Sequence, residues 1–209
     1  MDLSEFYNAD LYSSPHVGRN LAEARGNNLK QMPHGLRKFG EVLFDVRGLV
    51  ILSNQNMEIS PPANKKLPRK VDGIPVSQKA NKIHFLHFCS WNHTPKPIAY
   101  YRVHYQSGEE ISIPIRDGVE IQDWWYPAYR FEETEEGVIR VENPDFPTPP
   151  TDAKVAWQGS NEYIEPSYMR IRVYHYEWEN PVPESPIASL TLESTHTPAA
   201  PTIIAITVE

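Results

Sequence analysis

The chain has 209 residues, of which 40% are hydrophobic and 22% charged, a globular rather than a disordered composition. The net charge of −7, with a single short basic segment at 65–70, argues against nucleic acid as a partner, because phosphates require a basic footprint. The 20 prolines and the aromatic content of 11% argue against a helical protein, and no apolar stretch is long enough to insert into a membrane.

No linker interrupts the chain, so we expect one domain over residues 1–209. Residues 1–40 mix Asn, Gly and Pro with scattered apolar residues, which predicts a loop-rich segment that packs on the rest of the domain. One short helical turn is expected at 21–25. The first residues are polar and acidic, which indicates neither a signal peptide nor a transit peptide.

The first predicted strand region is 41–53, where Val42, Phe44 and Val46 alternate with Leu43 and Asp45. A polar connection follows at 55–71. The next strand, 82–90, is apolar at almost every position, which is typical of a central strand covered on both faces.

Two strands at 98–106 and 110–115 are joined by a short Gly-containing turn, which predicts a hairpin. A long loop is expected from Tyr126 to Asp152, and strands at 153–157, 169–178, 187–193 and 202–208 complete the chain. About eight alternating strands without an amphipathic helix predict an all-β fold, an antiparallel β-sandwich.

Histidines cluster in and after the predicted strand 82–90, but their spacing argues against a metal site. His84 and His87 are three residues apart and point to opposite faces of a strand. His87 shares a face with Cys89 and meets His104 only if an unknown register allows it. Cys89 is the single cysteine and is expected to be a small buried hydrophobe. We therefore predict no metal ligands and no cofactor.

The sequence also has no recognisable catalytic centre. It contains no Gly-x-Ser-x-Gly motif and no glycine-rich phosphate loop, and Cys89 lies within a strand rather than at an exposed turn. The 27 acidic residues leave a pair of catalytic carboxylates open, although no pair is distinguished. No catalytic residue is assigned, and the chain is expected not to be an enzyme.

Aromatic and amide side chains recur just beyond the predicted strands, which suits the recognition of sugars, because rings stack on pyranose faces and amides bind hydroxyl groups. The candidate ligand-binding residues are Trp91, Asn92, Trp125, Tyr126, Trp157, Asn161 and Arg170.

The strand 169–178 alternates in the same way, placing Ile171 and Val173 on one face and Arg170, Arg172 and Tyr174 on the other. This second face suits sugar recognition, but stacked arginines and tyrosines also form an ordinary solvent-facing surface.

Several phrases of the sequence resemble galactose-binding-like jelly-roll domains of the NPCBM-related type: Gly73–Val76, KIHFLHF, HYQSGEEISIPI, DGVEIQDWW, AWQGSN and IIAITVE. The resemblance covers most of residues 40–209. It implies a jelly-roll sandwich that serves as an accessory, carbohydrate-binding module of a larger bacterial protein, located outside the cell or in the periplasm. It also implies a structural calcium ion in some members, but no dense Asp/Asn/Gly loop supports one here.

Three functions follow as hypotheses. The first is a non-catalytic carbohydrate-binding module with a glycan as partner. The second is a structural or protein-interaction module whose partner is a neighbouring domain or protein. The third, a sandwich-fold glycoside hydrolase or lyase, requires two carboxyl groups about 5–10 Å apart in a cleft.

Overall fold

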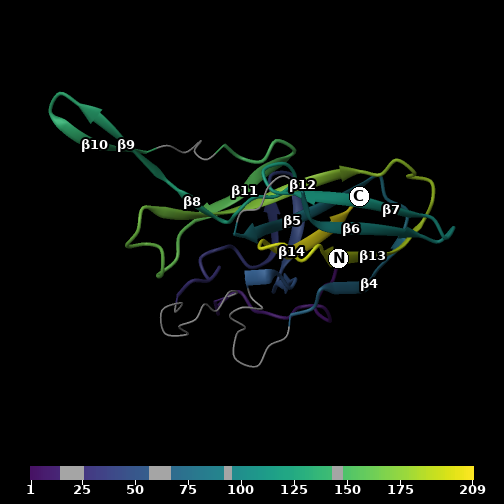
Figure 1. The fold of residues 1–209 in the computed structure, drawn as a ribbon. Helices are drawn as coiled ribbons and strands as arrows, with labels where there is room; N and C mark the ends of the chain where they lie inside the picture. Colours follow the sequence, from purple (N-terminus) through teal and green to yellow (C-terminus); the bar gives the residue numbers. More distant parts are fainter. Residues whose placement is uncertain (15–25, 57–66, 92–95, 143–147) are drawn as a thin grey trace.

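The computed structural model describes residues 1–14, 26–56, 67–91, 96–142 and 148–209, and these residues are almost entirely strands and connecting loops (Figure 1). The strands are β1 Gly35–Phe39, β2 Val42–Val46, β3 Val50–Ile51, β4 Lys70–Gln78, β5 Lys82–Ser90, β6 Pro97–Tyr105, β7 Glu110–Arg116, β8 Trp125–Pro127, β9 Tyr129–Thr134, β10 Gly137–Glu142, β11 Ala153–Gly159, β12 Met169–Glu179, β13 Ile187–Ser194 and β14 Ala200–Val208.

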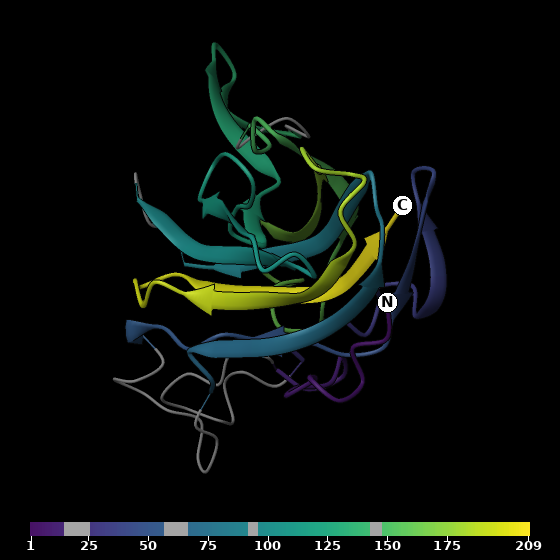
Figure 2. The ribbon, with the colours of Figure 1, turned by 90° about the vertical axis from the view of Figure 1, so that its right-hand side faces the viewer.

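Two large antiparallel sheets form the body of the protein. The six-stranded sheet has the order β11-β12-β5-β14-β3, with β8 also paired to β12, and the four-stranded sheet has the order β4-β13-β6-β7. Figure 2 shows β4, β13 and β6 of the four-stranded sheet running side by side. The fold is therefore an all-β antiparallel sandwich, as the sequence predicts.

The core between the two sheets, here called the inner cluster, explains why β5 is apolar throughout. Phe85 and Cys89 of β5 point into it, together with Tyr101 and Val103 of β6 and Leu190 of β13. All five side chains are buried. Alternate residues of a strand face opposite sides, so the remaining apolar residues of β5 need a second cover.

That cover is a second hydrophobic core, the outer cluster, on the other face of the six-stranded sheet. It contains Leu86 and Phe88 of β5, Phe44 of β2, and Leu29 and Met32 of the N-terminal segment. The β1–β2 hairpin lies next to the N-terminus in Figure 2. The prediction that 82–90 is covered on both faces is thus confirmed.

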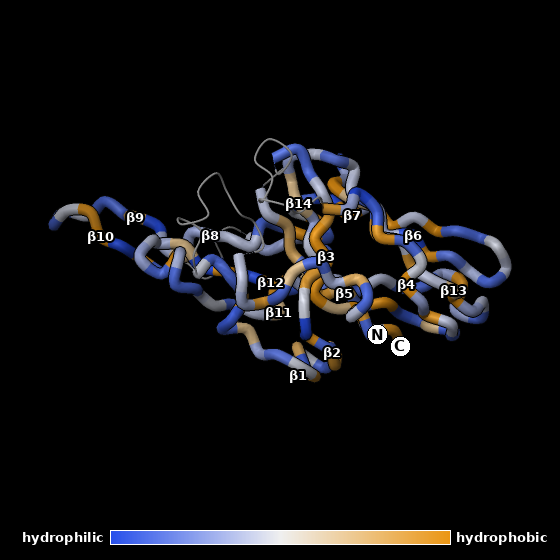
Figure 3. The backbone as a smooth tube through the Cα atoms, turned by 90° about the horizontal axis from the view of Figure 1, so that it is seen from below, coloured by the Kyte–Doolittle hydropathy of each residue, from blue (hydrophilic) through white to orange (hydrophobic). Residues whose placement is uncertain are grey.

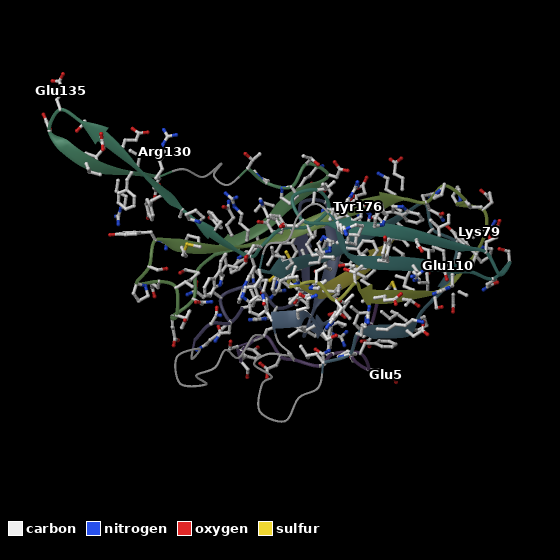
Figure 4. The ribbon with its side chains drawn as sticks, viewed as in Figure 1. Glu5, Lys79, Glu110, Arg130, Glu135 and Tyr176 are labelled. Carbon is white, nitrogen blue, oxygen red and sulfur yellow. The ribbon has the colours of Figure 1, made fainter. Side chains whose placement is uncertain are left out.

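The prediction of a long loop from Tyr126 to Asp152 is wrong, because strands β8, β9 and β10 occupy much of this segment. β9 and β10 form a two-stranded antiparallel hairpin that projects from the body (Figure 1). Figure 4 places Glu135 at its tip and Arg130 along its side. Figure 3 shows a short apolar stretch in β10 within this otherwise hydrophilic hairpin.

Two further strands were not predicted. β1 lies in the segment expected to be loop, and β4 begins at the end of the expected polar connection. Both are largely exposed on the solvent side and rich in charged or glycine residues, which weakens the apolar alternation. The helical turn expected at 21–25 lies outside the described residues.

Candidate functional site

The predicted aromatic site divides between the two faces of the six-stranded sheet, because neighbouring residues of a strand point in opposite directions. Trp125 and Trp157 pack against the outer cluster. Their chain neighbours Tyr126 and Gln158 meet each other, and the Tyr126 hydroxyl donates a hydrogen bond to Gln158 Oε1 over 2.8 Å. Tryptophans and polar groups that adjoin in the sequence are therefore separated in space.

Trp125 and Trp157 form part of the framework. The Trp125 ring lies between Trp124 and Tyr163, with ring centroids 6.1 and 5.7 Å apart and the planes within 30° of parallel. A Cβ atom on Gly159 would lie 2.3 Å from the Trp157 ring, so this indole packs directly on the glycine backbone.

Three other candidates lie apart from these residues. Trp91 follows β5 with 37% of its surface exposed and a positive φ of 63°. Asn92 lies outside the described residues. Asn161 is buried, and its Nδ2 donates to Asn27 Oδ1 and to the Asn28 carbonyl, both over 3.1 Å. Asn161 thus joins the N-terminal segment to the β11–β12 connection.

Tyr126 and Arg170 do come together, as directly opposite residues of the β8–β12 pairing. They line an open pocket with a volume of about 400 Å³, within the range of small-molecule sites. Strands β8 and β11, which carry some of its lining residues, lie on the side of the molecule from which the β9–β10 hairpin projects (Figure 1). Its lining residues are Tyr126, Ala128, Tyr129, Glu142, Gln158, Gly159, Ser160 and Arg170.

One wall of the pocket carries a chain of polar groups. Arg170 Nη2 donates to the Tyr129 hydroxyl over 3.4 Å, and that hydroxyl donates to Glu142 Oε1 over 3.4 Å. The other guanidinium nitrogen, Nη1, donates to the Met169 carbonyl over 2.8 Å. The two 3.4 Å hydrogen bonds are at the weak end of the range, so ligand hydroxyl groups can replace them at low cost.

Arg172, which is almost fully buried, contacts two of the residues that line the pocket. Its guanidinium carbon lies 3.8 Å from the centre of the Tyr126 ring, and its Nε donates to Gln158 Oε1 over 3.3 Å. Tyr174, two residues further along β12, is also buried. The interpretation of this face as an ordinary solvent-facing surface is therefore wrong at both positions.

Ser160 adds a polar atom without an internal partner. Its Oγ is buried and makes no hydrogen bond with any residue that the structure describes, although it lines the pocket. A buried hydroxyl without a partner is costly, and a ligand or water hydroxyl in the pocket would satisfy it.

The aromatic wall continues beyond the pocket onto the hairpin. The Arg140 guanidinium carbon lies 4.5 Å from the centre of the Tyr129 ring and 5.1 Å from that of Tyr168. The Phe131 ring meets Tyr168 edge to face at 5.5 Å and remains 59% exposed. The pocket therefore opens onto a strip of exposed rings.

Tyr129, Glu142 and Ser160 were missed because they lie outside the predicted strands. The alternation of YRFEET and GVIRVE around Glu135–Glu136 is a hairpin signal in the sequence that would have found the first two. No comparable signal marks Ser160, whose role depends on burial.

His87 and Cys89 are both fully buried within the sandwich. His87 Nε2 donates to the Glu120 carbonyl over 2.9 Å and its Nδ1 accepts from the Tyr101 hydroxyl over 3.0 Å; burial lowers the pKa of His87 to about 3. Burial raises the pKa of the Cys89 thiol well above its ordinary value. His104 bonds Thr191 on the outward face of β6, so the three side chains do not converge.

The part of the chain that the structure describes contains no helix that is long and apolar enough to cross a membrane. In comparisons with known protein families, curated proteins and solved structures, nothing matched the chain.

Proposed function

We propose that this protein is a non-catalytic carbohydrate-binding module whose ligand occupies the pocket lined by residues of β8, β9, β10, β11 and β12. The observation that carries the proposal is the partly exposed Tyr129 ring together with Gln158, Glu142 and Arg170 around one open pocket, which the buried Tyr126 also lines. Aromatic faces stack on the C–H faces of sugars, and planar amide, carboxylate and guanidinium groups bind pairs of hydroxyl groups.

The exposed rings beyond the pocket support a ligand longer than one sugar. Phe131 and Tyr168 extend the aromatic surface along the hairpin, and Arg140 lies between Tyr168 and the pocket residue Tyr129. We therefore expect an oligosaccharide to bind with one residue in the pocket and the next on this strip.

The resemblance to galactose-binding-like jelly-roll domains agrees with this proposal. On that basis the chain would be an accessory module of a larger bacterial protein that meets glycans outside the cell or in the periplasm.

A glycoside hydrolase requires two suitably spaced carboxyl groups. Glu142 is the one carboxylate among the described residues that line the pocket, which favours binding over hydrolysis.

The rival function is protein interaction, and the β9–β10 hairpin is the feature that favours it. Phe131 and Val138 on this projecting element are 59% and 66% exposed. Large apolar side chains on a projecting strand pair are typical of contact surfaces.

The test is a glycan array followed by isothermal titration with the best ligand. Tyr129→Ala and Gln158→Ala should each weaken binding by about tenfold or more, because a lost stacking or bidentate contact costs about 1–2 kcal/mol. The matched control is Tyr100→Ala, which removes another half-buried tyrosine that lies against an arginine, Arg102, but away from the pocket.

Equal loss of affinity in Tyr100→Ala and Tyr129→Ala would contradict the assignment of the pocket. A lack of binding to plant, microbial and host glycans alike would contradict the function itself.

A further inference from the structure

Two imidazoles and a carboxylate meet where β5 pairs with β12, further along β12 than the pocket residue Arg170. The register places Glu177 directly opposite His84, and His175 lies two residues earlier in β12 on the same face. His84 Nδ1 is 3.0 Å from His175 Nε2 and 3.7 Å from Glu177 Oε2. One ligand atom from each residue lies within 4.8 Å of the other two.

These separations fit a metal ion. Zinc binds imidazole nitrogen and carboxylate oxygen at similar distances in a tetrahedron, so two of its ligand atoms are about 3.4 Å apart. The distances of 3.0 and 3.7 Å from His84 Nδ1 bracket this value. The ligand atoms of His175 and Glu177 are at most 4.8 Å apart, so the three groups would have to draw together around an ion.

The three side chains are held in place by their neighbours. His84 is 1% exposed, and Phe44 of β2 packs edge-on against the His175 ring at 5.3 Å. Lys82 Nζ binds Glu177 Oε1 at 2.6 Å, which leaves Oε2 facing the imidazoles. Outer groups of this kind orient the ligands of protein metal sites.

A second carboxylate lies behind His84. Glu209 Oε2 is 3.3 Å from His84 Nε2, the ring nitrogen on the far side from His175. This nitrogen is buried and makes no hydrogen bond within the described parts of the chain. A carboxylate near the outer nitrogen of a histidine favours a proton there and leaves the inner nitrogen, Nδ1, to bind a metal.

The surrounding charges do not oppose a cation. Lys82 and Lys154 lie beside the cluster, Lys154 directly across from His175. Glu177, Glu179 and Glu209 supply three carboxylates against these two ammonium groups. The Glu177 side chain is 40% exposed, so an ion and a water ligand can enter from that side.

We propose that His84, His175 and Glu177 bind one divalent transition-metal ion of the zinc class, with water at the remaining position. Two nitrogen ligands and one oxygen ligand suit zinc rather than calcium or magnesium, which take oxygen ligands. The ion ties β5 to β12 across the centre of the six-stranded sheet. The alternative explanation of the 3.0 Å distance is a simple hydrogen bond between the two imidazoles. A zinc-binding experiment distinguishes this explanation from a metal site.

The test is isothermal titration of the full chain, treated with chelator, with Zn²⁺ alone. We expect saturable one-to-one binding and a rise in Tm, with no such rise for Mg²⁺ or Ca²⁺. Loss of an outer-shell partner costs 10–100-fold in metal affinity, so removing a direct ligand in His175→Gln or Glu177→Gln should cost about 100-fold or more. Both replaced side chains are partly exposed, which favours folding of the variants.

The matched control is His104→Gln, because His104 also lies partly exposed on a strand with a carboxylate, Glu110, 3.3 Å away, but belongs to no three-residue ligand cluster among the described residues. Zinc affinity should not change in this variant. An absence of saturable zinc binding, or equal affinity in folded His175→Gln and His104→Gln, would overturn the proposal.

Discussion

Asp123 has a largely buried carboxyl group whose Oδ1 accepts the Trp125 backbone N–H over 3.0 Å. Desolvation raises its pKa from 3.8 to about 6, and the nearby Asp117 acts in the same direction. Because the pKa of Asp123 is raised in the folded state, the contribution of this group to stability is greatest below pH 3.8 and is lost as the pH rises through about 6. Asp123 therefore destabilises the protein once it is ionised.

Asp123→Asn keeps the oxygen that accepts the Trp125 amide but cannot ionise. Relative to the native chain, the free energy of unfolding of the variant should increase by about 1–2 kcal/mol between pH 5 and pH 8. Urea denaturation at both pH values measures it. A difference between the two proteins that does not change with pH would show that Asp123 titrates normally.

At the level of single residues, the sequence named Tyr126 and Arg170, which line the pocket, among the candidate binding residues, but it could not separate them from Trp125 and Trp157. The face of the sheet on which each side chain lies decides that difference, since Trp125 and Trp157 pack against the outer cluster while Tyr126 and Arg170 line the pocket. The prediction of no metal ligands rested on spacing within one strand. It could not include His175, which is brought beside His84 by pairing across 91 residues.

Among the elements, the β9–β10 hairpin is the least connected to the core. None of the described residues in the two hydrophobic clusters lies between 129 and 142. In the sheet topology the hairpin pairs only with itself among the described strands. Its contribution is therefore to surface chemistry rather than to the stability of the sandwich.

Replacing Arg130–Val141 with an Asn-Gly turn should leave the free energy of unfolding within about 0.5 kcal/mol of the native value, because no core contact is lost. Binding of an oligosaccharide should weaken more than binding of a single sugar, since the pocket keeps Tyr129 and Glu142. Chemical denaturation and titration with both ligands test this. A large loss of stability would mean that the hairpin packs on the sandwich.

The same variant separates the rival function from the proposed one. If the exposed Phe131 and Val138 form a protein interface, light scattering should show a mass that rises with concentration in the native chain and not in the shortened one. A native chain that stays monomeric and still binds sugar would count against self-association through the hairpin.

On the scale of the whole molecule, the sandwich depends on two cores rather than one. Phe44 joins the β1–β2 hairpin to the outer cluster and is fully buried, whereas Leu43 beside it in the same strand is 48% exposed. The sequence alternation of Val42, Phe44 and Val46 predicted this difference, and the burial pattern of β2 confirms it.

Phe44→Ala should lower the free energy of unfolding by about 3–5 kcal/mol, because it leaves a cavity beneath the hairpin. Leu43→Ala is the matched control and should change it by less than about 1 kcal/mol, since the side chain is half exposed. Thermal or urea unfolding followed by near-ultraviolet circular dichroism measures both. Similar costs in the two variants would contradict the assignment of the outer cluster.

The sequence by itself determined that this chain forms antiparallel sheets, which face of β2 is buried, and that β5 is a central strand covered on both faces. These properties follow from alternation within one strand, a local pattern. The tertiary structure alone decided which strands are neighbours, and hence that Tyr126 meets Gln158 and that His84 meets His175 and Glu177. Register is set by the packing of whole sheets, so contacts between distant strands cannot be read from the spacing of residues along the chain.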